Sequence, residues 1–474
     1  MQRITLALVV VLVASACSGD GAASTDASPT TSAPTPPPTT APRALLDSEG
    51  RPIPASPGAP DGPLDPAVVA DLDLALGTPT ERIDLEAVAR LGASGDTRVA
   101  WLLADLLRFF QVGSVTDAAV AAFEELTGTE VTDRFAWGQV TDRLIAWDLP
   151  GPPGYVGWKR GLFEAIEPKW SPFFDDEDAA IDWRWLSWGG VYIDDRPLDR
   201  TGETCLGCIP ALNDPAVTDA AGGDWYPDDE IVFGVVVGSE ARAYPRNIME
   251  VHEMVNDTLG GRRIGMPYCT LCGSAQAYFT DDVPAGYETF ELRTSGLLSR
   301  SNKVMYEFHT FSVFDTFTGE ALSGPLQDEE VTLELVSTRT STWGDWKAAH
   351  PGTTIVARDG GIGRSYATDP LGGRDAFGPI FPVGEVDPRR PVQEPVLGVI
   401  APDGAPVAFA VGAVISALDG GGAVEFAGIR VVTDGAGLAA ETLAGAPLAA
   451  HQAFWFAWSQ FHPATLLWPE GEGA

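Results

Sequence analysis

A motif of the form W-x-x-W-x-x-x-H-P-x-T occurs twice in the chain, at residues 343–353 and again at residues 455–465. Its two tryptophans and its histidine fall on one face of a helix, and the proline ends that helix. A repeat of this kind predicts a duplicated scaffold, with two related halves at about 210–352 and about 395–465.

The region before the first motif reads as strands and turns. Residues 230–237 and 240–245 are rich in β-branched and aromatic side chains, and the Gly-Ser pair between them is typical of a hairpin turn. A short helix that carries His252 is expected directly after this hairpin. We therefore assign residues 201–474 to a β-rich domain that contains the internal duplication.

Residues 66–148 have a different pattern, with leucines and valines at three- and four-residue steps that are typical of helices. Residues 93–107 resemble a HEAT-type repeat. A solenoid needs about three repeats to bury a core, so this region is expected to pack on the rest of the chain. Five tryptophans within 158–188 are expected to cover the junction. We assign 66–200 to a helical, HEAT-like domain, and the predicted fold class is α+β.

The N-terminus has the pattern of a secretory signal, with Arg3, an apolar run at 4–14 and small residues before Cys17. This arrangement resembles the lipobox of bacterial lipoproteins, in which the cysteine is acylated and becomes the new N-terminus. We assign 1–17 to a lipoprotein signal peptide, with Cys17 as the lipidated residue. Residues 18–65 are rich in Ser, Thr and Pro and are expected to form a disordered tether. The folded part is then lipid-anchored on the outer face of the cell membrane.

Acidic residues outnumber basic residues by 66 to 30. Nucleic-acid binding needs the opposite balance, because the protein must neutralise phosphates. The sequence therefore argues against a nucleic-acid partner. The expected partners are the membrane, through the lipid anchor, and another protein of the cell envelope.

Apart from the lipobox residue, the chain has four cysteines in two C-x-x-C pairs, Cys205/Cys208 and Cys269/Cys272. Disulfides are permitted outside the cytoplasm, but four cysteines are too few to staple a chain of 474 residues. Clustering in two tight pairs favours metal binding or redox chemistry over stapling.

Three interpretations of the second pair stay open. In the first, Cys269, Cys272 and His252 hold a transition metal, with Met305 and His309 completing the ligand set. Sulfur-rich ligation suits copper(I), or zinc when four ligands close a tetrahedron. In the second, the pair exchanges between dithiol and disulfide with partner thiols. In the third, the cysteines are structural disulfides in a non-catalytic binding module of the envelope.

Further motifs are H-E-M-V-N-D at 252–257, Y-C-T-L-C-G at 268–273 and N-K-V-M-Y at 302–306. Together with the repeated tryptophan motif, they resemble the bacterial domain-of-unknown-function family 3179, whose members are uncharacterised extracytoplasmic proteins. That family has no activity to carry over, so the resemblance implies only that a site lies near the first two motifs. The sequence has no nucleophile-elbow or H-E-x-x-H motif, and whether the protein is an enzyme stays open.

Overall fold

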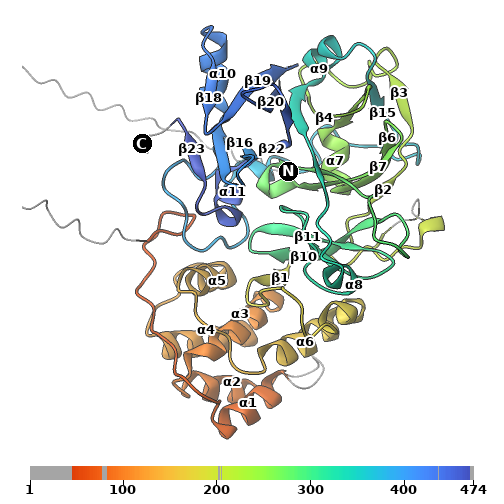
Figure 1. Ribbon diagram of the computed structural model, residues 1–474. Coiled ribbons are helices and arrows are strands. Elements are labelled where there is room, and N and C mark those ends of the chain that lie inside the picture. Colours follow the sequence, from red (N-terminus) through yellow and green to blue (C-terminus); the bar gives the residue numbers. More distant parts are fainter. Residues whose placement is uncertain (1–44, 77–82, 201–202, 204, 436, 470–474) are drawn as a thin grey trace, which may run out of the picture. The chain divides into compact units, whose positions relative to one another are not determined.

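The computed structural model describes residues 45–469 except 77–82, 201–202, 204 and 436 (Figure 1). The predicted signal peptide, Cys17 and most of the predicted tether lie outside the described residues. Within the described part of the chain, no helix is both long enough and apolar enough to cross a membrane. Helices come first in the chain and strands follow, which confirms an α+β fold.

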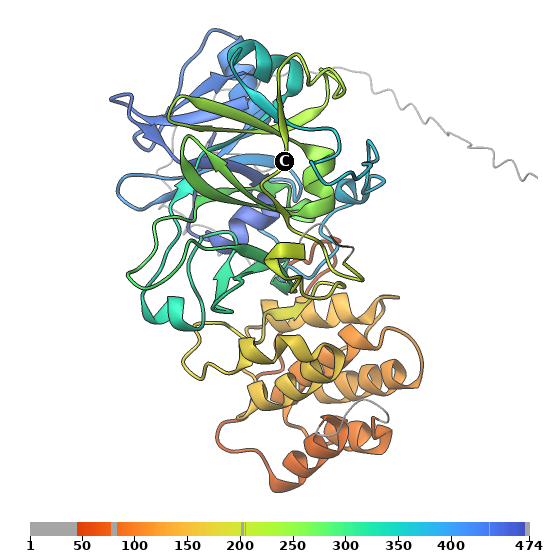
Figure 2. The same ribbon diagram turned by 90° about the vertical axis from the view of Figure 1, so that its right-hand side faces the viewer.

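The N-terminal part is helical, and its helices form one group in both views (Figures 1 and 2). The carboxylate of Asp84 caps the second helix by accepting from the backbone N–H groups of Glu86 and Ala87. Gly128 ends the fourth helix in the left-handed conformation, with a φ of 66°. The HEAT-like character of the group stays a prediction. Its helices are α1 (Pro66–Leu76), α2 (Leu85–Gly92), α3 (Ala100–Phe109), α4 (Ser114–Thr127), α5 (Ala136–Ala146) and α6 (Tyr155–Ile166).

The segment 45–64 packs against these helices instead of forming part of a disordered tether. The indole N–H of Trp147 donates to the carbonyl of Pro54 at 2.7 Å, and the hydroxyl of Thr97 donates to the carbonyl of Gly58 at 2.6 Å. The prediction that disorder extends through residue 65 is therefore wrong for this segment. Composition alone missed it, because the order comes from hydrogen bonds with distant helices.

Aromatic side chains join the helices to the strands, as the tryptophan-rich stretch predicted. The indole N–H of Trp170 donates to the carbonyl of Ser295 at 2.8 Å, and the ring of Phe173 lies 5.3 Å from that of Tyr306. Strand β1 (Leu186–Trp188) already pairs with β10 of the β-rich part. The predicted domain boundary at residue 200 stays a prediction, and β1 shows that residues before it contribute a strand to the β-rich part.

Within the described residues, the β-rich part contains five sheets. Two of them have the same design: a hairpin, an antiparallel outer strand and a parallel strand on the other side. Their orders are β14-β4-β5-β15-β3 and β22-β16-β17-β23. The strands are β3 (Val217–Asp219), β4 (Ile231–Val237), β5 (Glu240–Pro245), β14 (Thr338–Thr342), β15 (Thr354–Val356), β16 (Pro395–Ile400), β17 (Pro406–Ala410), β22 (Ala450–Phe454) and β23 (Leu466–Trp468).

The repeated motif forms helix α9 (Trp343–Ala349) and helix α11 (Trp455–Phe461). In α9 the indole N–H of Trp346 donates to the Thr353 hydroxyl at 3.0 Å. In the second motif, Trp458 donates to Thr465 at 2.9 Å. The helix, the indole and the threonine thus make the same contact in each sheet. These shared contacts fit the predicted duplication, which itself stays a prediction.

Three sheets remain, and one of them contains strand β7, which ends at Cys269. One has the order β13-β9-β7-β6-β2, another is β1-β10-β11-β12, and the third is the meander β18-β19-β20-β21. Their strands and the remaining helices are β2 (Leu212–Asn213), α7 (Arg246–His252), β6 (Met254–Leu259), β7 (Arg262–Cys269), β8 (Ser274–Ala275), β9 (Ala277–Phe279), β10 (Leu292–Ser299), β11 (Asn302–Glu307), β12 (Val313–Asp315), α8 (Pro325–Asp328), β13 (Leu335–Val336), α10 (Val411–Asp419), β18 (Val424–Phe426), β19 (Ile429–Asp434), β20 (Gly437–Thr442) and β21 (Pro447–Leu448).

Candidate functional site

The second C-x-x-C pair lies beside a partly open cavity of about 290 Å³. Cys269 ends strand β7, and a 3-10 turn, η4 (Thr270–Cys272), follows it. Gly273 has a φ of 60°, a conformation that suits glycine, and strand β8 then pairs back onto β7. Helix α7 and strands β10 and β11 contribute the other walls. The charged or reactive side chains that line the cavity are Glu250, Glu253, Cys269, Lys303 and Arg374.

The two thiols differ in their access to the cavity. Cys269 lines it, whereas Cys272 is fully buried beneath and its thiol donates to the carbonyl of Ser301 at 3.3 Å. Both are free cysteines in the described part of the chain. Burial, together with the neighbouring Cys269, raises the pKa of Cys272 well above its usual range. Cys272 therefore keeps its proton, and Cys269 presents its sulfur to the cavity.

A buried ammonium group lies beside these thiols. The Nζ of Lys303, on β11, donates to the carbonyl of Glu253 at 2.6 Å and lies 3.4 Å from the carboxylate Oε2 of the same residue. Burial lowers the pKa of Lys303, while the charges of Glu253 and Cys269 act in the opposite direction. The hydroxyl of Thr270 donates to the other carboxylate oxygen at 3.0 Å. The lysine therefore joins the end of α7 to the turn that carries the thiols.

Glu253 reaches this position through an unusual backbone conformation. Its φ is 49°, in the left-handed region, and its N–H donates to the carbonyl of Met249 at 2.7 Å, which ends α7. Glycine is the usual residue for such a helix end, and a non-glycine residue costs about 1 kcal/mol there. Glycine would lack the carboxylate that contacts Lys303 and Thr270. The strain is thus tied to the placement of a charged group at the cavity wall.

Glu250 is the second acid of the cavity, two residues before α7 ends at His252. Burial raises the pKa of Glu250 to about 7, against the opposing charge of Arg246, whose Nε lies 3.4 Å from its Oε1. A carboxyl group with this pKa takes up and releases protons near neutral pH. The cavity therefore combines a thiol, a buried cation and a proton acceptor.

His252, a predicted metal ligand, has both ring nitrogens engaged by protein groups. Its Nδ1 lies 2.7 Å from the carbonyl oxygen of Pro210, and its Nε2 lies 2.7 Å from the hydroxyl of Tyr366. A carbonyl only accepts, so Nδ1 carries the proton and Nε2 accepts from the tyrosine. Burial lowers the pKa of His252 to about 4. The neutral ring ties helix α7 to two loops, and it offers no free nitrogen to a metal.

The other two predicted ligands are also placed elsewhere. Met305 is fully buried in a core with Phe290 and Phe314, separate from the core that contains the two thiols. His309 is on the surface, where its Nε2 lies 4.0 Å from the carboxylate of Glu288. The structure does not bring these side chains to the C-x-x-C turn, because chain proximity and residue type do not determine which face of a strand a side chain occupies.

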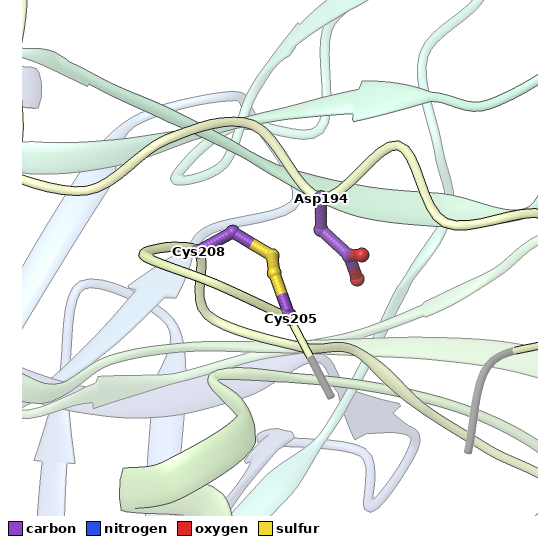
Figure 3. Close-up of side chains that lie close together, drawn as sticks. All are labelled: Asp194, Cys205 and Cys208. Atoms are coloured by element: carbon purple, nitrogen blue, oxygen red, sulfur yellow. A yellow bond between two sulfur atoms is a disulfide. The ribbon is translucent and has the colours of Figure 1, made fainter. Parts of the chain in front are cut away.

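A different cluster has the composition of a metal site. Among the described residues, only Asp194, Cys205 and Cys208 form a group of three or more His, Cys, Asp or Glu side chains with ligand atoms within 4.8 Å of one another (Figure 3). The two sulfurs form a disulfide. Asp194 accepts from the Nε of Arg196 at 2.6 Å and from the N–H of Ala211 at 2.8 Å. The two sulfurs and the carboxylate therefore already have partners. The cluster is a disulfide-closed loop that packs on a buried carboxylate.

The predicted copper or zinc ligand set is therefore not assembled. Cys269, Cys272 and His252 do not form a second such group within the part of the chain that the structure describes. The ammonium of Lys303 also lies in the field of both sulfurs, and its charge opposes a bound cation. The metal site stays a prediction without geometric support.

Sequence reasoning missed Lys303, Glu250 and Thr270. Lys303 belongs to the N-K-V-M-Y motif and is one of only four lysines in the chain. A lysine directly before the apolar run Val304-Met305-Tyr306 is a signal that was available. Nothing in the local sequence distinguishes Glu250 from an exposed helical glutamate, because its properties come from burial.

A protein-family comparison agrees with the motif resemblance. The family model described as "Protein of unknown function (DUF3179)" matches residues 206–434. This region carries the DUF3179 domain. It contains the C-x-x-C turn, both acids of the cavity and Lys303, and it ends before the second tryptophan motif. No curated protein and no solved structure matches the chain. The DUF3179 description assigns no activity, so function has to be argued from the cavity.

Proposed function

We propose that Cys269 and Cys272 form a thiol–disulfide exchange site that acts on a small disulfide bound in the cavity. The observation that carries this proposal is the asymmetry of the pair: one thiol lines the cavity, and the other is buried next to it with a raised pKa. A thiol–disulfide exchange reaction needs one sulfur that attacks the substrate and a second sulfur that resolves the mixed disulfide.

The reaction balances without a further cofactor. The thiolate of Cys269 attacks one sulfur of the substrate R–S–S–R′, the substrate S–S bond breaks, and R′–S⁻ leaves. The thiol of Cys272 then gives up its proton and attacks the Cys269 sulfur, which releases R–S⁻. Two protons from the protein dithiol end on the two product thiols. The protein is oxidised by two electrons to a disulfide, and a thiol reductant of the envelope resets it.

The charged groups of the cavity have roles in these steps. Lys303 stabilises the Cys269 thiolate before attack. Glu253 and Thr270 hold the ammonium and the turn in place through the contacts at 2.6 and 3.0 Å. Glu250, with its pKa of about 7, accepts the proton that leaves the dithiol and returns it to a product thiol.

This site is best suited to the oxidising space outside the cytoplasm. We propose that the lipid on Cys17 anchors the protein on the outer face of the cell membrane, where small disulfides are present. The motivation is the signal pattern at residues 1–17. A non-catalytic binding module would not need a reactive thiol in a cavity, and the exchange function is therefore preferred over it.

The test is a trapping experiment on purified, reduced protein with hydroxyethyl disulfide. Cys272→Ser should accumulate a mixed disulfide on Cys269, seen as one added mercaptoethanol group by intact-mass spectrometry. Cys269→Ser should form none. The matched control is Cys205→Ser/Cys208→Ser, which removes the other pair and should still turn over. Equal labelling of wild type and Cys269→Ser, or no oxidation of the pair by excess disulfide, would refute the proposal.

A further inference from the structure

A second, larger cavity adjoins the thiol cavity. Its volume is about 580 Å³, and it lies between helices α3 and α5 and the loop 374–382. Four residues line both cavities: Gly189, Val191, Arg374 and Phe381. The two cavities therefore adjoin at these residues. We call the larger cavity the arginine groove.

Arg108 in this groove is a buried cation without an anionic partner. Its guanidinium lies 4.4 Å from the ring centre of Trp137 and 5.2 Å from that of Trp188. Its Nε donates to the carbonyl of Trp188 at 2.5 Å. Only 7% of the residue is exposed, and no carboxylate pairs with it among the residues that the structure describes. Buried charges are normally paired, so the terminal nitrogens of Arg108 are open to an anion.

The acids of the groove do not fill this role. Asp142 accepts from the backbone N–H groups of Val383 and Gly384 at 2.7 and 2.8 Å. Asp133 and Glu49 both pair with Arg51, at 2.6 and 3.0 Å. They therefore have partners of their own.

Arg374, on the wall that the two cavities share, also has no side-chain hydrogen bond or ion pair within the described ranges. Two arginines thus face the groove with free donors. Three arginines and three acids line the groove. Arg51 pairs with two of those acids, Glu49 and Asp133, and this leaves Arg108 and Arg374 without an ion pair among the described residues.

The rim of the groove is apolar. Phe135, Phe377 and Ile380 line it and expose 62%, 83% and 42% of their surfaces. Exposed aromatic side chains around a polar floor are typical of sites that bind amphipathic small molecules.

We infer that the substrate of the exchange site is a small disulfide with an anionic group, whose carboxylate binds Arg108 and Arg374 while its sulfurs reach Cys269. The two arginines without an ion pair, and the position of Arg374 in the lining of both cavities, carry this inference, and it rests on the exchange function proposed above. The apolar rim contacts the carbon chain of the substrate. Guanidinium groups suit a carboxylate because they donate two parallel hydrogen bonds.

The test compares three disulfides of similar length and different charge: dithiodipropionate, which is anionic, hydroxyethyl disulfide, which is neutral, and cystamine, which is cationic. The rate of Cys269 oxidation in the wild type should be highest with dithiodipropionate and lowest with cystamine. Arg374→Gln and Arg108→Gln should each lower the ratio of the dithiodipropionate rate to the hydroxyethyl disulfide rate about tenfold, which corresponds to about 1.4 kcal/mol.

Two controls separate the outcomes. Arg90→Gln removes an exposed positive charge on α2. Arg90 lines neither cavity, so this variant should not change the order of the three rates. Because Arg374 is exposed, its variant should fold even if the Arg108 variant does not. Equal rates with all three disulfides would overturn the anion site and keep the exchange function. No reaction of Cys269 with any of them would overturn the exchange function and the substrate assignment with it.

Discussion

Replacing Glu250 by glutamine is expected to stabilise the fold above neutral pH. Burial raises the pKa of this carboxyl from 4.5 to about 7. Between these values the folded state binds more protons than the unfolded state, so the free energy of unfolding falls as the pH rises. The loss is about 1.4 kcal/mol per pH unit, or about 3 kcal/mol by pH 7. Glutamine has the same shape and no charge, so the variant avoids this loss.

The assay is urea unfolding of both proteins at several pH values, followed by tryptophan fluorescence. The difference in unfolding free energy should be small below about pH 4.5, grow from there to about pH 7, and stay constant above. His252, whose pKa is lowered to about 4, contributes stability that is lost as the pH falls from its usual value toward 4. That contribution is present in both proteins and cancels in the difference.

Glu288→Gln is the matched control, because the Glu288 side chain is 86% exposed. Its difference from the wild type should stay near zero at every pH. Two results would refute the reasoning: a Glu250→Gln variant that is less stable than the wild type above pH 7, or a gain that is the same at all pH values. Either would mean that the carboxyl is well solvated or well paired in the folded protein.

Three further predictions follow from the site and the N-terminus. Lys303→Met should slow alkylation of Cys269 by iodoacetamide about tenfold, since the thiolate loses a neighbouring cation, whereas Lys303→Arg should retain most of the rate. Reduced wild type and Cys269→Ser should hold equal, low amounts of copper and zinc by elemental analysis, and metal that disappears with both this change and His252→Ala would restore the metal interpretation. Cys17→Ala should release the protein from the membrane fraction, and unchanged retention without lipid would contradict the anchor.

The sequence was sufficient wherever a signal is local. The hairpin around Gly238 forms because its turn chemistry and its flanking strands agree, and the pairing of Val237 with Glu240 is the one that a two-residue turn imposes. The W-x-x-W-x-x-x-H-P motif forms a helix in both places. The helical spacing of its tryptophans and histidine, and the proline that ends the helix, are signals that span only a few residues. The family resemblance was confirmed for residues 206–434 for the same reason.

The location of the site was also predictable, because the C-x-x-C turn and Gly273 mark it in the chain. The side chains that surround the thiols were not predictable. His252 was expected to face the thiols, but Glu253 does so, since the left-handed residue that ends α7 turns the chain. One such residue changes which of two neighbouring side chains reaches a cavity.

Tertiary structure alone decided the chemistry of the cavity. Lys303 is remote from the turn in the chain and meets Glu253 only because β11 packs beside β7. Burial by segments far away in sequence raises the pKa of Glu250, and it also encloses Arg108, which has no carboxylate partner among the described residues. Sequence determines which groups can titrate or react, whereas desolvation and the field of neighbouring charges, which set how they behave, exist only once the chain is packed.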